Sequence, residues 1–206
     1  MNVYLYVLDT LADWEIGYIT AEINSGRYSS WIDKPVELIK VGKTLDPIQT
    51  MGGITIAPDI DVNQLVLKKY DVVILPGANT WLDERNEAII NMISGKLNDI
   101  VVAAICGATA ALAAKGVLNN RRHTSNNLLF LKEFCPGYSG EENYSTESVV
   151  VDENLITANG CANLEFTFEI FKIMNFMEAT TLEAWYQLHR TQEGKYFYAL
   201  MESLNA

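Results

Sequence analysis

One run of the sequence constrains the fold more than any other: an apolar segment that passes directly into a stretch of small residues. Residues 100–105 are unbroken Ile, Val and Ala, typical of a strand buried on both faces. Cys106-Gly-Ala-Thr-Ala-Ala-Leu-Ala-Ala-Lys follows without a spacer. Gly107 and Ala108 are small enough for a sharp turn of the kind that nucleophile elbows require. The run therefore predicts a strand over 100–105, a tight turn at Cys106 and a helix over 108–115.

The rest of the chain alternates apolar strands with helical patterns. We predict further strands over 3–8, 36–41, 72–75, 148–151 and 155–158, and helices over 13–25, 83–96, 126–134 and 163–174. This alternation is typical of an α/β fold, a mostly parallel sheet flanked by helices on both faces. We expect one such domain over 1–177. Residues 178–206 carry aromatic and aliphatic side chains at three-to-four spacing, which predicts a helical extension packed on the domain or on a partner subunit.

Charge and hydropathy exclude several classes of partner. The chain has 26 acidic and 15 basic residues, a net charge of −11 that repels nucleic-acid phosphates, so no nucleic-acid binding is expected. No apolar run reaches the roughly 18 residues that a membrane span requires. The first residues have the pattern of a buried strand rather than of a signal peptide. We therefore expect a cytoplasmic protein without membrane contact.

The cysteine pattern argues against a metal centre. Cys106, Cys135 and Cys161 are widely spaced, form no CxxC pair and lie near no cluster of histidines. We predict no metal and no cofactor, and free thiols in a reducing compartment. Cys135 is expected to be a loop or core cysteine.

Three strand ends carry candidate functional groups. At a helix start, Cys106 is expected to have a pKa below the usual value of about 8.5, although a buried core cysteine is the alternative interpretation. Pro76-Gly-Ala follows a second strand and brings the N–H of Ala78 to the same edge, where it could form an oxyanion hole with the N–H of Gly107. Glu15 opens the first predicted helix, either as a solvated residue or as part of a site.

These segments, in this order, resemble the ThiJ/PfpI family, whose flavodoxin-like fold is shared with class I glutamine amidotransferases. The resemblance covers residues 1–177. It includes Gly-Gly…Pro-Asp at 52–59, Leu-Pro-Gly at 75–77, Ala-Ile-Cys-Gly at 104–107, Arg-His-Thr-Ser at 122–125 and Leu-Ile-Thr-Ala-Asn-Gly at 155–160. The family contains intracellular cysteine proteases, stress chaperones and glyoxalases or protein deglycases.

The resemblance also implies roles for particular residues. It implies that Cys106 is the nucleophile and that Glu15 is a buried, protonated acid in contact with the sulfur. It further implies backbone donors from Gly107 and Ala78, and a homodimer.

Departures from the family pattern narrow the expected chemistry. Gly107 stands where the protease branch has histidine, and Asn163-Leu-Glu replaces the His-x-Glu of amidotransferases. Glutaminase activity is therefore not expected, and peptide hydrolysis lacks a histidine base. An ungapped alignment from Cys106 places Asn126 where other members have histidine or an aromatic residue. His123 is expected to be a packing or surface residue, with contact to the site as the alternative, and His189 to be structural.

Cys161 lies beside the elbow if the resemblance holds. It is either an incidental small residue in a tight turn or a second thiol that captures oxidised Cys106 as a disulfide. The leading functional prediction is a cysteine enzyme acting on a small carbonyl compound such as methylglyoxal, or on peptides. The alternative is a non-enzymatic redox sensor or stress chaperone that uses an oxidisable cysteine.

Overall fold

A seven-stranded sheet forms the centre of the computed structural model, which describes residues 1–31 and 36–205. All neighbouring strands in it are parallel except β8, which runs antiparallel to β9 at one edge. A separate antiparallel pair, β3 (Ile48–Gln49) and β4 (Thr55–Ile56), lies outside it. In spatial order the strands of the sheet are β5 (Ile60–Asp61), β2 (Leu38–Gly42), β1 (Val3–Tyr6), β6 (Val72–Leu75), β7 (Val101–Ile105), β9 (Leu155–Ala158) and β8 (Val149–Asp152).

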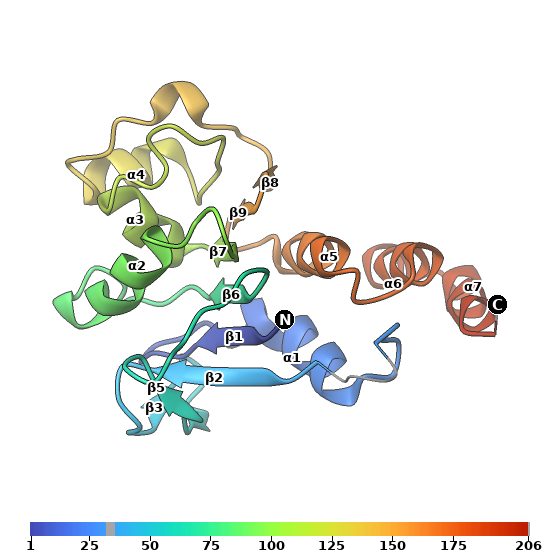
Figure 1. Ribbon diagram of the computed structural model, residues 1–206. Coiled ribbons are helices and arrows are strands. Elements are labelled where there is room, and N and C mark those ends of the chain that lie inside the picture. The colour runs from blue at the N-terminus through green and yellow to red at the C-terminus, as the bar shows by residue number, and fades with distance from the viewer. Residues whose placement is uncertain (32–35, 206) are drawn as a thin grey trace.

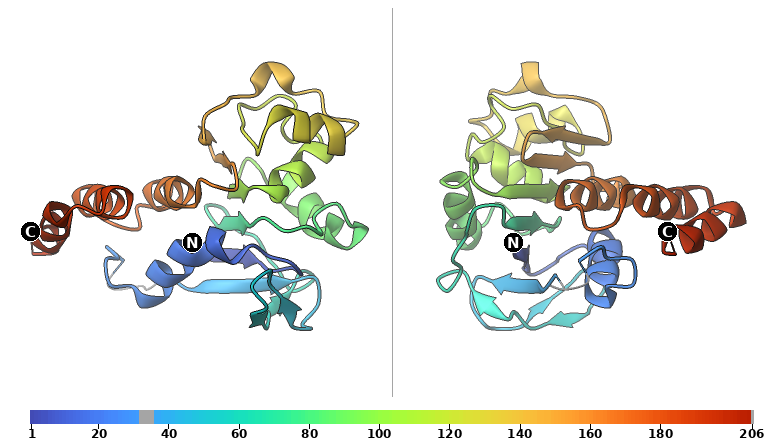
Figure 2. Two further views of the ribbon diagram at one scale, coloured as in Figure 1. Left: turned by 180° about the vertical axis from the view of Figure 1, so that it is seen from behind. Right: turned by 45° about the vertical axis from the view of Figure 1, so that its right-hand side comes forward.

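Helices cover both faces of the sheet, as the sequence predicts (Figures 1 and 2). One face carries α1 (Asp13–Ser25) and α5 (Asn163–Met174); the other carries α2 (Glu87–Ser94) and α3 (Gly107–Ala114). Single 3-10 turns lie at Glu84–Asn86 and Glu141–Asn143. The small side chains of α3 are buried almost throughout, so this helix lies close against the central strands.

Helix α4 (Leu128–Phe134) begins two residues later than the sequence predicts. The side chain of Asn127 accepts a hydrogen bond from the N–H of Phe130 at 2.7 Å and thereby caps the helix. Asn126 consequently lies outside the helix. Helix α2 is likewise shorter than the predicted range 83–96, because its first turn is a 3-10 turn.

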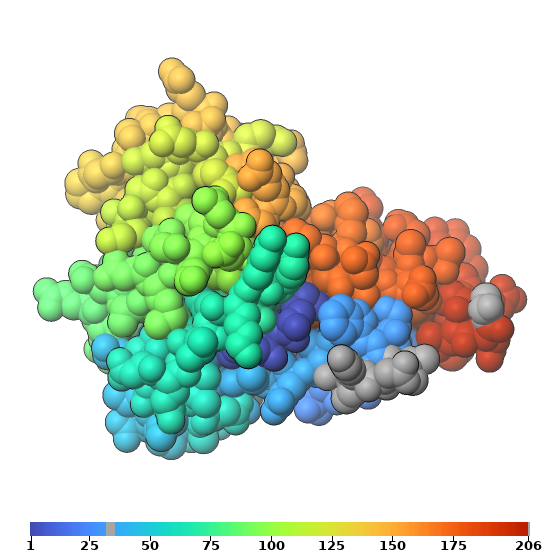
Figure 3. All heavy atoms as spheres, in the orientation of Figure 1, coloured from blue at the N-terminus to red at the C-terminus, as the bar shows by residue number. Residues whose placement is uncertain are grey.

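The C-terminal extension consists of α6 (Ala179–Thr191) and α7 (Gly194–Ser203). Trp185 of α6 is fully buried, packs against Phe171 and Tyr18, and donates a hydrogen bond from Nε1 to Glu22 Oε1 at 3.1 Å. Helix α6 therefore lies against α5 and α1, and Figure 3 shows these segments side by side. Helix α7 packs on α6 at the tip of the arm seen in Figures 1 and 2, where Phe197 and Tyr198 are exposed. No helix within the described residues is long and apolar enough to cross a bilayer.

Candidate active site

The elbow at Cys106 has a strained backbone. Its φ of +58° and ψ of −123° lie in a region that a residue with a side chain rarely adopts. The N–H of Cys106 donates to the carbonyl of Ala158 on β9 at 3.0 Å, and its carbonyl accepts from the hydroxyl of Thr109 at 2.6 Å. A Cβ on Gly107 would lie 2.6 Å from the carbonyl oxygen of Ala78, so only glycine fits there. Neighbouring segments thus hold the half-buried thiol in place.

The sheet order brings three chain segments to this elbow. Strands β1, β6 and β7 are adjacent and parallel, so their carboxyl ends meet at one edge. From β1 the chain continues to β2 on one side, and β6 lies on the other. This is the kind of topological switch point at which α/β sheets build their sites. Glu15, Gly77 and Cys106, which follow these three strands, converge there.

Glu15 is fully buried beside the cysteine sulfur. Its Oε2 accepts a hydrogen bond from the N–H of Gly77 at 2.5 Å. Its Oε1 has no hydrogen-bond partner within the described residues. This oxygen lies near the cysteine sulfur, because a Cβ on Gly160 would be 2.9 Å from Cys106 Sγ and 3.3 Å from Glu15 Oε1. Burial raises the pKa of Glu15 to about 7, and the N–H of Gly77 and the neighbouring thiol of Cys106 oppose this rise without outweighing it. Glu15 can therefore gain or lose a proton at neutral pH.

The structure reverses the expected direction of the pKa of Cys106. Burial raises this pKa, and the negative charge of Glu15 raises it further; the Asn126 amide and the N–H of Gly107 act in the opposite direction without outweighing them. The position of Cys106 at a helix start favours the thiolate, but the loss of solvent around the sulfur has the larger effect. When Glu15 is protonated its charge no longer opposes the thiolate, so the two groups are coupled through one proton.

Asn126 and Gly160 complete the surroundings of the sulfur. Asn126 Nδ2 lies 3.4 Å from Cys106 Sγ, and its Oδ1 accepts the N–H of Gly160 at 2.9 Å. A Cβ on Gly160 would lie 2.9 Å from Sγ.

Cys161 follows Gly160 and is exposed. Both Cys161 and Cys106 are free thiols, so the disulfide between them stays a prediction. Ala78 and Gly107, the predicted donor pair, lie close together: a Cβ on Gly107 would be 3.5 Å from the backbone nitrogen of Ala78.

Comparison with known proteins assigns the chain to a family. The sequence model of the DJ-1/PfpI family matches residues 1–173. The chain belongs to the DJ-1/PfpI family.

Individual members of the DJ-1/PfpI family are similar along nearly the whole chain. A Bacillus subtilis protein named uncharacterized protease YoaZ is 44% identical over 205 residues, 99% of this chain and 98% of the relative. A thiJ/pfpI family protein from Bacillus anthracis has a crystal structure with a TM-score of 0.95 and 45% identity, covering 98% of this chain and 96% of that one. Glutathione-independent glyoxalase DJR-1.2 of Caenorhabditis elegans is 24% identical over 152 residues, 70% of this chain and 77% of the relative.

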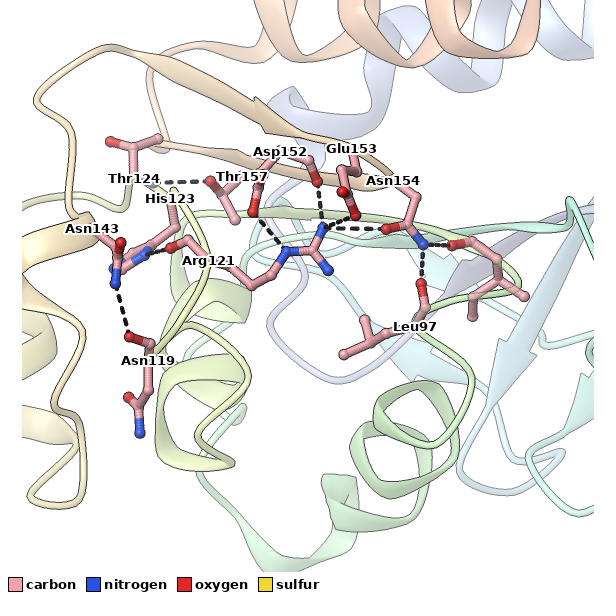
Figure 4. A network of polar contacts seen from close by, with 11 residues as sticks. Leu97, Asn119, Arg121, His123, Thr124, Asn143, Asp152, Glu153, Asn154 and Thr157 are labelled. Carbon is pink, nitrogen blue, oxygen red and sulfur yellow. Dashed lines mark hydrogen bonds and ion pairs between the residues drawn. The ribbon is translucent and has the colours of Figure 1, made fainter.

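Neither histidine of this DJ-1/PfpI chain hydrogen-bonds Cys106. His123 is buried; Nδ1 contacts the carbonyl of Arg121 and Nε2 the hydroxyl of Tyr138, each at 2.7 Å. Burial lowers the pKa of His123. In Figure 4 it lies in a polar network in which Arg121 also binds the β8–β9 turn. His123 is thus a packing residue, as expected, and His189 donates from Nδ1 to the carbonyl of Trp185.

Several further residues contribute to this DJ-1/PfpI site and were not predicted from the sequence. Trp14, 52% exposed, donates from Nε1 to the carbonyl of Gly160 at 3.1 Å, and Asn163 Nδ2 donates to the Trp14 carbonyl at 2.9 Å. Thr109 shares a 2.7 Å hydrogen bond with Ser125. A signal for Thr109 exists in the sequence, because it is the one hydroxyl in a run of small apolar residues.

Among the residues described, no three or more His, Cys, Asp or Glu side chains are arranged to hold a metal ion.

Proposed function

We propose that this chain is a cysteine-dependent enzyme that acts on small carbonyl compounds, with Cys106 as nucleophile and Glu15 as the proton-transfer group. One observation carries the proposal: a fully buried carboxyl group lies against the cysteine sulfur, and its pKa of about 7 suits it to act as both base and acid at neutral pH. The strained elbow presents the sulfur at the carboxyl edge of the sheet, which is where such sites form.

A 2-oxoaldehyde such as methylglyoxal fits this arrangement. The thiol proton passes to the Glu15 carboxylate while Sγ bonds to the aldehyde carbon, and the carbonyl oxygen then takes that proton, which gives a hemithioacetal. The N–H groups of Gly107 and Ala78 would stabilise the negative oxygen during this addition. Glu15 next removes the proton from the former aldehyde carbon and returns it to the neighbouring carbon through an enediol. The hydroxyl proton of the hemithioacetal passes to the former ketone oxygen, which leaves a thioester carbonyl and a new hydroxyl group. Water cleaves the resulting thioester to a 2-hydroxy acid and the free thiol.

This reaction needs no external oxidant or reductant. The aldehyde carbon is oxidised to the acid and the ketone carbon is reduced to the alcohol within one molecule. The name of the Caenorhabditis elegans relative, a glutathione-independent glyoxalase, supports this class of substrate.

Peptide hydrolysis, the activity in the name of the Bacillus subtilis relative, is less well supported by the site. Amide cleavage requires protonation of the leaving nitrogen, which cysteine proteases achieve with a histidine. The two histidines of this chain make their hydrogen bonds elsewhere. We therefore propose carbonyl addition and treat peptide hydrolysis as a separate arm of the test.

A second candidate function is redox sensing. Asn126 Nδ2 and the N–H of Gly107 lie next to Sγ, and a protonated Glu15 would add an O–H donor. Such donors would also bind the oxygens of a sulfenate or sulfinate at Cys106. In that case oxidation by peroxide, rather than turnover of a carbonyl, is the chemical event.

The test measures consumption of methylglyoxal and formation of lactate by the wild-type protein and three variants. We expect turnover by wild type and by Cys135→Ser, whose thiol is buried against Ala110, and loss of turnover in Cys106→Ser and Glu15→Gln. A fluorogenic peptide is assayed in parallel. Equal rates in Cys106→Ser and wild type would contradict the proposal. Absence of turnover together with stoichiometric oxidation of Cys106 by peroxide would support the sensor instead.

A further inference from the structure

The orientation of the Asn126 amide is determined by its hydrogen-bond partners. The backbone N–H of Gly160 can only donate, so the atom of Asn126 that it contacts at 2.9 Å must be the carbonyl oxygen, Oδ1. The other end of the amide, Nδ2, is consequently the atom 3.4 Å from Cys106 Sγ. A nitrogen with two hydrogens therefore faces the reactive sulfur.

The backbone on both sides of Asn126 is held in place. Ser125 shares a hydrogen bond with Thr109 at 2.7 Å, and the N–H of Thr124 donates to the hydroxyl of Thr157 at 2.9 Å (Figure 4). On the other side Asn127 caps α4. Because Thr109 also binds the carbonyl of Cys106 at 2.6 Å, the elbow and the segment that carries the amide are linked directly. The donor is thus preorganised toward the sulfur.

We propose that Asn126 is a catalytic residue that donates a hydrogen bond to the thiolate of Cys106. The assignment rests on the proposed function and deepens it. When the thiol proton moves to Glu15, the negative charge that remains on Sγ needs a donor, and hydrogen bonds to charged groups are among the strongest in proteins. The lowering of the pKa of Cys106 by this amide agrees with the geometry. An amide does not titrate, so its donation is the same at every pH at which the protein is folded.

The decisive variant is Asn126→Asp, which has nearly the same shape. The carboxylate still accepts the N–H of Gly160 but presents a negative oxygen, instead of an N–H, to the sulfur. We expect alkylation of Cys106 by iodoacetamide at pH 7 to be at least about tenfold slower, the factor that loss of one such hydrogen bond corresponds to. The midpoint of its pH dependence should move to higher pH. Asn126→Ala should slow alkylation in the same direction.

The matched control is Asn127→Asp, which adds the same charge one residue away and keeps a side chain able to cap α4. Rates are measured from pH 6 to 10 on the Cys106 peptide by mass spectrometry, so that labelling of the exposed Cys161 does not contribute. Circular dichroism and thermal melting report on folding. If Asn126→Asp does not fold, Asn126→Ala and Asn126→Ser provide the same comparison.

The proposal would be overturned if the folded Asn126 variants were alkylated as fast as wild type. It would also be overturned if Asn127→Asp slowed alkylation of Cys106 as much as Asn126→Asp does. The readout needs no substrate, so it is independent of the proposed function. If wild type turns over no carbonyl but Asn126→Asp still shifts the alkylation profile, the donor role stands and the proposed function fails. If turnover falls in Asn126→Asp while alkylation is unchanged, the residue is not a thiolate donor.

Discussion

Replacing Glu15 with glutamine should change the pH dependence of stability in a defined direction. The unfolded carboxyl group releases its proton near pH 4.5 and the folded one near pH 7. Between these values the folded state holds a proton that the unfolded state lacks, so the contribution of Glu15 to the free energy of unfolding falls as pH rises and is then constant above about pH 7. Since one pKa unit corresponds to about 1.4 kcal/mol, ionised Glu15 costs the folded protein about 3 kcal/mol.

Glu15→Gln removes this cost and retains an acceptor for the N–H of Gly77. We therefore expect the variant to be more stable than wild type by about 3 kcal/mol at pH 8 and to approach wild type near pH 5. The assay is urea unfolding followed by tryptophan fluorescence from pH 5 to 8, above the isoelectric point of about 4.6. Glu87→Gln, in the exposed first turn of α2, is the control and should follow wild type. Parallel pH profiles for wild type and Glu15→Gln would refute the buried, proton-exchanging carboxyl.

Four further outcomes are expected. Gly160→Ala places a methyl group 2.9 Å from Cys106 Sγ and should destabilise the protein by about 1–3 kcal/mol and slow alkylation of Cys106, measured by unfolding and by peptide mapping. Trp185→Ala should cost about 3–5 kcal/mol because the side chain is fully buried, whereas the half-exposed Phe197→Ala on α7 should change the free energy of unfolding little. One equivalent of peroxide should join Cys106 to Cys161, and absence of that crosslink in a peptide map would end this prediction. The protein should be a homodimer, and a monomeric mass by light scattering at micromolar concentration would contradict this.

The fold was predictable where the sequence pattern is long. The helix expected over 163–174 coincides with α5, and the strands expected over 72–75 and 155–158 coincide with β6 and β9, because several consecutive residues carry the same periodicity. Strands β3 and β5 and the pairing of β3 with β4 were missed, since strands of two residues carry no period; only a short extended stretch after the glycine turn at 52–53 was expected there. The start of α4 was misplaced by two residues, because the expected helix included Asn126 and Asn127, whereas the side chain of Asn127 caps a helix that begins at Leu128.

The site was only partly predictable. The strand-to-helix turn identifies Cys106 as a candidate nucleophile, and the family resemblance identifies Glu15 and Asn126 as its candidate neighbours. Burial is the largest influence on the pKa values of Glu15 and Cys106. The pKa directions of Cys106 and Glu15 depend on solvent exclusion, which no local pattern records, and the expected direction for Cys106 was wrong for that reason.

What the sequence by itself determined is therefore local: the alternation of strands and helices, and a thiol on a tight turn between Ile105 and Gly107. These follow from side-chain size and periodicity over a few neighbouring residues. Only the tertiary structure decided which groups surround that thiol. Glu15 and Gly77 are 62 residues apart along the chain and Asn126 and Gly160 are 34 apart, yet all four meet around the side chain of Cys106. Their contacts depend on the order of strands in the sheet, and their charges depend on the water that the sheet and its helices exclude.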